Sequence, residues 1–377
     1  MNIAIIDADL VYNGKHRFPN LACMKISGFY KSKGHNVDLV LEYSNKLENY
    51  DKVFISKVFT QTEVPDYILK MKNVEYGGTG FYYDKARPLP YEIEHHMPDY
   101  SLYDKFIKER INSGESLNTL KYYTDYSIGF TTRGCFRKCS FCVNKNYDKV
   151  CLHSPLDEFV LPDRKKICLL DDNVFGSPEW RNIFLQLQKT GKPFQYKQGL
   201  DERLLTKEKC NILFNSKYDG DYIFAFDNIK DKDIIIEKAK IIRNVFKTKG
   251  HNIKFYVLCA YDENNKYDEQ FWINDIKNTF ERIFILAKYN FKPYIMRYEK
   301  YKESPYYGVY VNFAQWCNQP SFFYNYSIRQ FCEKYDDRAS KGKRTSATYK
   351  YFKAIENATF KEYIDIIPKE LIMPYWK

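Results

Sequence analysis

Cys135-Phe136-Arg137-Lys138-Cys139-Ser140-Phe141-Cys142 is the stretch around which the chain is organised. Three thiols lie within this octet in the spacing C-x3-C-x2-C. Close thiolates repel one another unless a metal holds them together, and a thiolate is a soft ligand that suits iron–sulfur clusters and zinc. Three cysteines can bind three irons of a cubane cluster and leave the fourth iron open to another ligand.

Zinc is the competing metal for this octet. Structural zinc is bound by four ligands, usually from C-x2-C or Cys/His pairs, whereas the nearest histidine, His153, follows Cys142 by eleven residues. The spacing therefore favours an iron–sulfur cluster over zinc. A set of cysteines without any metal is the third interpretation.

The octet resembles the signature of the radical S-adenosylmethionine (SAM) superfamily, including the aromatic residue, Phe141, directly before the third cysteine. The resemblance implies that Cys135, Cys139 and Cys142 bind a 4Fe-4S cluster and that Phe141 contacts the adenine of SAM. It also implies that the open iron chelates SAM and that the reduced cluster cleaves SAM to methionine and a 5′-deoxyadenosyl radical. An electron donor of the flavodoxin or ferredoxin type is implied as a partner, and the substrate is left open.

Composition places the chain among ordinary globular proteins. Its 377 residues, 44% hydrophobic and 28% charged, predict two domains, with room for a C-terminal extension. The net charge of +11 favours an anionic partner, nucleic acid among them, although a charge of this size also serves solubility. The cysteines outside the octet show no secreted disulfide pattern, and no apolar stretch approaches the roughly 20 residues of a membrane span. We therefore expect a cytoplasmic protein without membrane segments.

Residues 1–104 read as a Rossmann-like domain. Short apolar strands are predicted over residues 3–6, 37–41 and 53–56, with a helix over 20–33. Such alternation favours a parallel sheet, whose ligands bind at the carboxyl ends of the strands. The loop from Asp7 to His16 is therefore a candidate site, but the absence of G-x-G-x-x-G argues against a dinucleotide.

In its N-terminal position, this domain resembles the cobalamin-binding-type domain of one subgroup of radical SAM enzymes. That subgroup often carries D-x-H-x-x-G, whose histidine ligates cobalt, and Gly14-Lys15-His16-Arg17-Phe18 does not match it. Cobalamin therefore stays open as a further cofactor. With cobalamin the chain would be a cobalamin-dependent radical SAM methyltransferase, and without it the domain would be a scaffold or a substrate contact. The glycines of residues 77–80 predict a tight turn and only weakly a phosphate site.

A linker over residues 105–126 leads to six predicted strands, over residues 127–133, 167–170, 194–198, 222–226, 253–259 and 294–298. The apolar run at 282–286 fits either a strand or a helix. Six strands are too few for a closed eight-stranded barrel. Radical SAM barrels have six, so the resemblance implies a partial (β/α)6 barrel over residues 127–300.

Polar residues follow most of these strands, where α/β folds place their chemistry. Asp and Asn also commonly start the next helix, so a capping role stays open for each of them. The resemblance implies that Asp171 or Asp172 binds the amino group of SAM, since the usual glycine-glycine-glutamate is absent. It implies further cofactor contacts at Gln198, Asp201, Asp227, Ala260 and Glu263, with Ala260 where glycine is usual. No catalytic residue is predicted.

Residues 301–377 predict a mainly helical C-terminal extension. Basic residues with interleaved aromatics mark its middle: Arg338, Lys341, Lys343, Arg344, Tyr349, Lys350, Tyr351, Phe352 and Lys353. Such a mixture can bind single-stranded nucleic acid, or it can be a solvated helix surface. Two rivals to a radical SAM enzyme follow: a zinc-stabilised nucleic-acid-binding protein, and a degenerate relative that binds SAM only as a scaffold.

Overall fold

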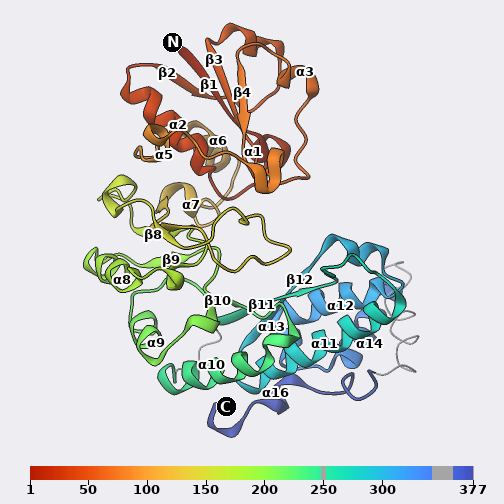
Figure 1. The fold of residues 1–377 in the computed structure, drawn as a ribbon. Helices are drawn as coiled ribbons and strands as arrows, with labels where there is room; N and C mark the ends of the chain where they lie inside the picture. The colour runs from red at the N-terminus through yellow and green to blue at the C-terminus, as the bar shows by residue number, and fades with distance from the viewer. Residues whose placement is uncertain (248–251, 342–359, 377) are drawn as a thin grey trace. The chain divides into compact units, whose positions relative to one another are not determined.

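The computed structural model describes residues 1–247, 252–341 and 360–376, and Figure 1 shows its course. The chain forms two compact units, Met1–Lys197 and Gln198–Lys377. Both units combine helices with parallel sheets, which confirms the α/β class predicted from the sequence.

The first unit begins with a four-stranded parallel sheet in the order β2-β1-β3-β4 (Figure 1). Its strands are β1 (Asn2–Asp7), β2 (Asn36–Leu39), β3 (Lys52–Ser56) and β4 (Val74–Gly77). All three strands predicted before residue 60 are therefore confirmed. The chain crosses from β1 to β2 on one side and then returns to β3 on the other. The switch point of the sheet, where such folds bind ligands, thus lies between β1 and β3.

The helices of this first part are α1 (Ala8–Tyr12), α2 (Leu21–Ser32), α3 (Asp66–Leu69), α4 (Thr79–Tyr82) and α5 (Tyr91–Glu94), with the 3-10 turns η1 (Asn45–Asn49) and η2 (Tyr83–Lys85). Strand β1 is buried on both faces. Ile3 and Ile5 pack in one apolar cluster together with Cys23 of α2, and Ala4 and Ile6 pack in another. The continuous apolar run of β1 is explained by this two-sided burial.

A second parallel sheet of the first unit has the order β5-β8-β9. Its strands are β5 (Tyr126–Gly129), β8 (Lys166–Leu169) and β9 (Phe194–Tyr196), and a separate antiparallel ribbon pairs β6 (Thr132–Arg133) with β7 (Cys151–Leu152). The accompanying helices are α6 (Asp104–Asn112), α7 (Lys121–Thr124) and α8 (Trp180–Lys189), with the 3-10 turns η3 (Leu156–Glu158) and η4 (Val174–Gly176). The ribbon encloses the cysteine octet in the loop between its two strands.

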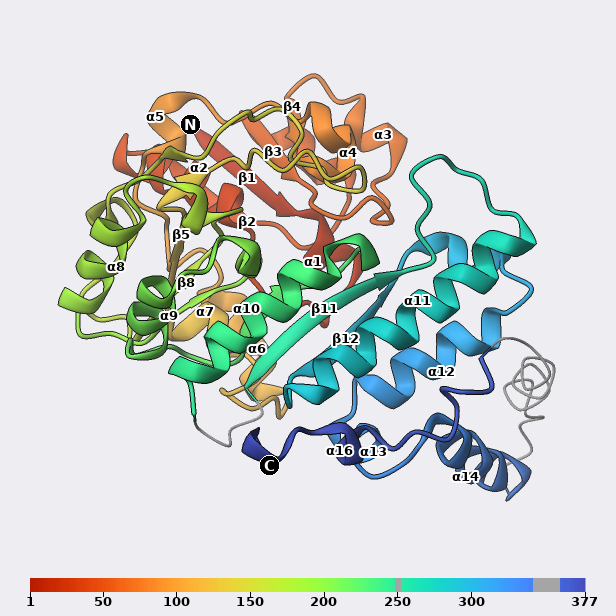
Figure 2. The same ribbon diagram turned by 60° about the horizontal axis from the view of Figure 1, so that its bottom comes forward.

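The second unit contains a parallel sheet in the order β10-β11-β12. Its strands are β10 (Tyr222–Ala225), β11 (Ile253–Cys259) and β12 (Lys292–Arg297). Its longer helices are α9 (Lys207–Phe214), α10 (Lys232–Val245), α11 (Glu269–Lys288), α12 (Tyr307–Cys317) and α14 (Ile328–Lys341). The shorter elements are α13 (Pro320–Phe323), α16 (Pro368–Leu371), η5 (Glu202–Leu204), η6 (Ile229–Asp231), η7 (Glu299–Glu303) and η8 (Pro374–Trp376). In Figure 2, α11 and α12 run beside β11 and β12.

All six strands predicted between residues 127 and 298 are present as strands. The ambiguous run at 282–286 belongs to α11, a helix that begins where the Asp268 carboxylate accepts a hydrogen bond from the N–H of Phe271 at 2.8 Å. The six strands form two sheets in two units. Their closure into one partial barrel therefore stays a prediction.

The helical character predicted after residue 301 is found in the described part of that region. The basic segment from Lys343 to Lys353 lies outside the described residues, and so do the side chains of Arg338 and Lys341. Within residues 1–247, 252–341 and 360–376, no helix is long and apolar enough to cross a membrane.

Gly129 at the end of β5 provides a test of the packing around the second sheet. A Cβ atom at this position would lie 2.3 Å from Cγ of Phe159, a ring that is itself 1% exposed. We expect Gly129→Ala to lower the free energy of unfolding by about 1–3 kcal/mol, the usual effect of overpacking. Urea denaturation measures this change. Gly77→Ala is the control, because nothing lies within 4 Å of its added Cβ, and an equal loss in both variants would contradict the packing.

Candidate functional site

The cysteine octet lies in a loop whose two ends meet at the ribbon of β6 and β7. Thr132 stands opposite Leu152 in this ribbon, and the N–H of His153 donates to the carbonyl of Thr131 at 2.9 Å. Residues 134–150 therefore leave and return at one place, just after β5. This is the position that the sequence predicts for a cluster-binding loop.

Gly134 allows the two ends of the loop to approach closely. Its φ is +93°, in the left-handed region, and a Cβ atom would lie 2.6 Å from the carbonyl oxygen of Lys149. Both facts require glycine directly before Cys135.

Asp171, which follows β8, fixes the start of the cysteine loop. Its fully buried carboxylate accepts hydrogen bonds from the N–H and hydroxyl of Thr131 at 3.0 and 2.5 Å. It also accepts hydrogen bonds from the N–H and hydroxyl of Thr132 at 2.6 and 2.7 Å. Burial raises the pKa of Asp171, and the bonds to the two threonines oppose that rise. Three of these bonds end on Oδ1 and one ends on Oδ2, so both carboxylate oxygens hold the start of the loop.

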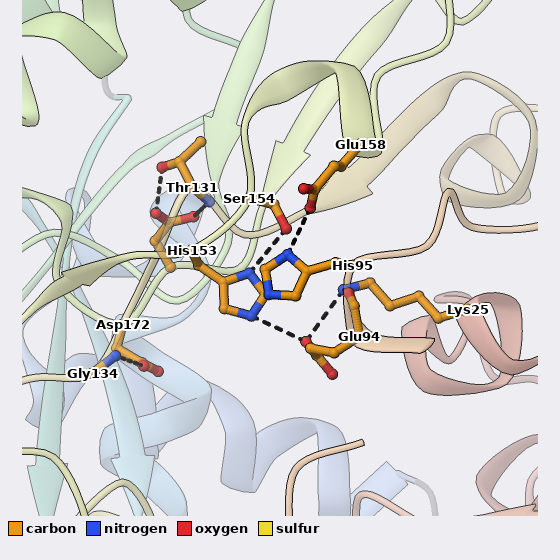
Figure 3. A network of polar contacts seen from close by, with 10 residues as sticks. Lys25, Glu94, His95, Thr131, Gly134, His153, Ser154, Glu158 and Asp172 are labelled. Carbon is orange, nitrogen blue, oxygen red and sulfur yellow. Dashed lines mark hydrogen bonds and ion pairs between the residues drawn. The ribbon is translucent and has the colours of Figure 1, made fainter. Parts of the chain in front are cut away.

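Asp172 bridges the two ends of the octet. Its Oδ2 accepts from the N–H of Gly134 at 2.9 Å (Figure 3), and its Oδ1 accepts from Nδ2 of Asn144 at 2.5 Å. Gly134 precedes the first cysteine, and Asn144 lies two residues after the third. Burial raises the pKa of Asp172, while the Gly134 N–H and the charge of Arg133 lower it.

Hydrogen bonds also reach the sulfurs of Cys135 and Cys142. Nδ2 of Asn173 and the N–H of Arg137 each donate to Sγ of Cys135 at 3.4 Å. The N–H of Asn144 donates to Sγ of Cys142 at 3.4 Å. N–H donors favour the charged thiolate and tune iron–sulfur centres. The chemistry of this donor set therefore fits a cluster.

The three thiols of the octet are half-buried. Among the residues that the structure describes, no group of three or more His, Cys, Asp or Glu side chains is arranged to hold a metal ion. The assignment of Cys135, Cys139 and Cys142 as metal ligands stays a prediction.

Phe141, the predicted adenine contact, is half-buried within the octet. Its carbonyl accepts a hydrogen bond from the hydroxyl of Tyr83 at 3.3 Å, and the side chain of Asn146 donates to the carbonyl of Asp84. The cysteine loop therefore contacts η2, the turn that follows the N-terminal sheet.

A polar network lies beside the base of the cysteine loop (Figure 3). Oε1 of Glu94 pairs with Nζ of Lys25 at 3.2 Å and with Nε2 of His153 at 3.3 Å. Lys25 belongs to α2 and Glu94 ends α5, whereas His153 directly follows the ribbon. Burial raises the pKa of Glu94, but the hydrogen bond from His153 and the charge of Lys25 outweigh it and lower the pKa to about 2.

Neighbouring His95 extends this network. Its ring stacks on that of His153 with centroids 4.8 Å apart, and its Nδ1 pairs with Oε2 of Glu158 at 2.9 Å (Figure 3). His96 lies elsewhere, with its Nε2 3.1 Å from the hydroxyl of Ser32. Nothing in the sequence connects Lys25, Glu94 and His153, which are far apart along the chain.

The second unit holds the other predicted cofactor residues: Gln198, Asp201, Asp227, Ala260 and Glu263. Gln198 and Glu263 are exposed. Asp201 accepts a hydrogen bond from Nε of Arg203 at 2.9 Å, and Arg203 also donates to Asp231 at 3.2 Å. These residues belong to a different unit from the cysteine loop.

Arg282 of α11 joins the carboxyl ends of β10 and β11. Its Nη1 donates to the carbonyls of Phe226, Asp227 and Leu258 at 3.0, 2.8 and 2.8 Å. The Asp227 carboxylate accepts from the N–H of Leu258 at 2.9 Å, and burial raises its pKa. Asp227 therefore lies at the same sheet edge as the predicted fifth-strand motif.

Ala260 has a φ of +62°, a left-handed conformation that glycine adopts without cost. Its N–H donates to half-buried Asp275 at 2.8 Å, and the same carboxylate accepts from the Tyr310 hydroxyl at 2.8 Å. Sequence reasoning did not single out Asp275 or Arg282.

Glu202 is a third residue that the sequence did not single out. It is 2% exposed, and its Oε2 accepts from the N–H of Ala225 at 3.2 Å. Burial, reinforced by the charge of Asp201, raises the pKa of Glu202 to about 8.

The polar residues at the carboxyl edge of the N-terminal sheet serve the fold. Asp9 is 2% exposed and accepts from the N–H groups of Val58 and Phe59 at 2.7 and 3.3 Å and from the Thr62 hydroxyl at 2.5 Å. These bonds tie the loop after β1 to the loop after β3.

The glycine-rich turn after β4 packs against the same loop. A Cβ atom on Gly78 would lie 2.3 Å from the carbonyl oxygen of Lys57, and one on Gly80 would lie 2.6 Å from Cγ of Lys57. Close packing against Lys57 thus explains both glycines without a bound phosphate.

No protein-family model matches the sequence, and no curated protein matches it. Among solved structures, the chain is similar to the cobalamin-dependent S-adenosylmethionine radical enzyme OxsB with aqua-cobalamin and S-adenosylmethionine bound, at 12% identity and a TM-score of 0.46. That match covers 75% of this chain and 52% of the other. A match to OxsB with aqua-cobalamin alone has 11% identity and a TM-score of 0.35, and covers 78% and 49%. The chain thus spans about half the length of these proteins, and likeness at this level decides nothing about its activity.

The four bonds to Asp171 lead to a prediction about stability. Asp171→Asn places an amide NH2 against groups that donate, so at least one partner, the N–H of Thr131 that bonds Oδ2, loses its acceptor. We expect the free energy of unfolding to fall by about 1–3 kcal/mol in urea denaturation. Asp163→Asn, at an exposed aspartate, should change it by less than about 0.5 kcal/mol. Equal effects of the two substitutions would contradict the buried contact set.

Asp7 makes the stability of the chain depend on pH. Its carboxylate accepts from the N–H of Leu10 at 3.2 Å and from the Tyr103 hydroxyl at 2.8 Å, but burial raises its pKa from 3.8 to about 7. Between these two values the unfolded chain has released a proton that the folded chain keeps. Stability therefore falls as pH rises from about 4 to about 7, by at most about 4 kcal/mol.

Asp7→Asn should remove this contribution. The measurement is the free energy of unfolding of both proteins in urea across this pH range. The free energy of unfolding of the wild type should fall relative to that of the variant as pH rises, and the difference should become constant above about pH 7. A difference that is independent of pH would show that Asp7 is ionised throughout.

Proposed function

We propose that the chain is a radical SAM enzyme in which Cys135, Cys139 and Cys142 hold a 4Fe-4S cluster. The observation that carries the proposal is the clamp on the cysteine loop: residues 171–173 after β8 hydrogen-bond both ends of the C-x3-C-x2-C loop and one of its sulfurs. Parallel strands place their chemistry at this end. When bound, the cluster would cleave SAM reductively to a 5′-deoxyadenosyl radical that acts on an unidentified substrate.

The two neighbouring aspartates have different roles in this proposal. Asp171 already accepts four hydrogen bonds from Thr131 and Thr132, so we assign it to positioning the loop. Asp172 accepts two hydrogen bonds, so it can still accept from the amino group of SAM. Phe141 is the proposed adenine contact in the same unit.

The second unit would contribute the remaining SAM contacts. The proposed residues are Gln198, Asp201, Asp227, Ala260 and Glu263. The proposed substrate class rests only on charge. The net charge of +11 favours an anionic substrate, and nucleic acid is one such substrate. A donor of the flavodoxin or ferredoxin type would supply electrons, and an oxygen-sensitive cluster suits a reducing cytoplasm.

Cobalamin would turn the proposed enzyme into a radical methyltransferase. One observation favours it, the parallel order β2-β1-β3-β4 of the N-terminal sheet, and a shared fold does not assign a ligand. A cobalt assay on anaerobically prepared protein decides this point.

The proposal predicts iron and radical chemistry in the purified chain. After anaerobic reconstitution, we expect about four irons and four sulfides per chain. With SAM and dithionite, 5′-deoxyadenosine should form and be detected by liquid chromatography and mass spectrometry. Cys139→Ala should abolish its formation, because the cluster would lose one of three ligands.

Cys151→Ala is the matched control, since Cys151 is an exposed thiol outside the octet, and it should retain activity. A colourless protein that binds zinc would overturn the cluster and support the zinc-stabilised nucleic-acid-binding alternative. A full cluster without any 5′-deoxyadenosine would leave a SAM-binding scaffold and overturn the enzyme.

A further inference from the structure

Asn173 follows Asp171 and Asp172 after β8, and its side chain contacts the sulfur of the first cysteine of the octet. Its Nδ2 donates to Sγ of Cys135 at 3.4 Å, across 38 positions of the chain. Asn173 is 2% exposed, whereas the Cys135 thiol is half-buried. The bond therefore joins a buried amide beside the sheet to a thiol of the loop.

Two further donors to the sulfurs belong to the loop itself. The N–H of Arg137 donates to Sγ of Cys135, and the N–H of Asn144 donates to Sγ of Cys142, each at 3.4 Å. Each donor lies two residues after its cysteine, so a local turn of the backbone supplies it whatever side chain stands there. The Asn173 bond differs, because it comes from outside the loop and depends on the identity of one side chain.

The chemistry of residues 171–173 matches the groups that each residue faces. Ionised Asp171 and Asp172 offer only acceptors, and they face N–H and hydroxyl donors of the loop. Asn173 faces a sulfur with an amide NH2, where a third carboxylate would repel a thiolate. Its side chain makes no capping hydrogen bond to the 3-10 turn η4 that follows. The capping role that the sequence left open therefore does not account for Asn173.

Packing against η4 holds this amide in place. A Cβ atom on Gly176 of η4 would lie 3.5 Å from Cγ of Asn173 and 2.9 Å from Cε1 of the Phe136 ring. The turn thus packs both on Asn173 and on the octet. The amide is a preorganised donor to the loop.

We propose that Asn173 is a positioning residue that raises the reduction potential of the cluster for which Cys135 is a predicted ligand. An N–H donor stabilises negative charge on a sulfur, and hydrogen bonds to the sulfurs help to set the potential of iron–sulfur centres. Reduction adds one electron without making or breaking a bond, so the donor stabilises the reduced state more than the oxidised state. This inference rests on the proposed function, because it requires the cluster.

The test is a redox titration of the reconstituted full chain with dithionite, in which electron paramagnetic resonance measures the reduced cluster. Asn173→Leu removes the donor and keeps a branched side chain of similar shape. At a fixed potential the ratio of reduced to oxidised cluster should fall about tenfold, the usual effect of losing one hydrogen bond to a charged group. For a one-electron couple this is a potential lowered by about 59 mV. Asn182→Leu, the same exchange at an exposed position of α8, should leave the potential unchanged.

Two more variants separate the potential from folding. Asn173→Ala removes the same donor without adding atoms, so it should lower the potential even if Asn173→Leu does not fold. Gly129→Ala should destabilise the chain by overpacking but keeps the donor, so its potential should equal that of the wild type.

The outcomes distinguish this inference from the proposed function. An unchanged potential in the Asn173 variants would overturn the inference and leave the proposed function intact. An equal fall in Gly129→Ala would also overturn the inference, because the potential would then follow stability. A wild-type chain that assembles no cluster would overturn the proposed function, and this inference with it.

Discussion

The candidate site depends on the hydrogen bonds between residues 171–173 and the cysteine loop, most of which the carboxylates of Asp171 and Asp172 accept. Residues 134–150 contain no helix or strand, and ordering each residue of such a loop costs about 1–2 kcal/mol of backbone entropy. Part of this cost is offset at the two ends of the loop, through Thr131, Gly134 and Asn144. Contacts also hold its middle, where the carbonyl of Phe141 accepts from the Tyr83 hydroxyl at 3.3 Å and Lys138 pairs with Asp148 at 2.7 Å. The loop that carries the three cysteines is therefore held both by the residues after β8 and by the turn η2 of the same unit.

Much of this fold could be predicted from the sequence because parallel strands buried on both faces appear as short apolar runs. The runs at residues 3–6, 167–170 and 253–259 are strands for this reason. The polar residues after the strands were also correctly located, but their roles were only partly separable. Asp7 does cap α1, through the N–H of Leu10, whereas Asp171 caps no helix and holds a loop. Both positions look alike in the sequence, because an aspartate after an apolar run does not reveal its hydrogen-bond donors.

Other features had no signal in the sequence. The network of Lys25, Glu94 and His153 joins segments up to 128 positions apart, and Arg282 donates to carbonyls at positions 226, 227 and 258. Such contacts follow from tertiary packing and not from local pattern. The run at 282–286 was ambiguous for a different reason: this part of α11 is buried on all sides, so it lacks the alternation of apolar and polar residues that marks a helix. Whether the two three-stranded sheets close into one barrel is likewise not encoded in any single stretch.

The N-terminal sheet shows why a ligand cannot be assigned from fold and residue type alone. A Rossmann-like edge with aspartates and a glycine-rich turn suggests a cofactor site, yet Asp9 binds the loop after β3 and Gly78 packs on Lys57. Counting donors and acceptors removes these residues from the candidates, because their hydrogen-bonding groups and the space beside them are already used by the fold. The same count separates Asp171, which accepts four hydrogen bonds, from Asp172, which accepts two. A polar side chain at the carboxyl edge of a sheet is therefore a ligand candidate only to the extent that the fold has left its hydrogen-bonding capacity unused.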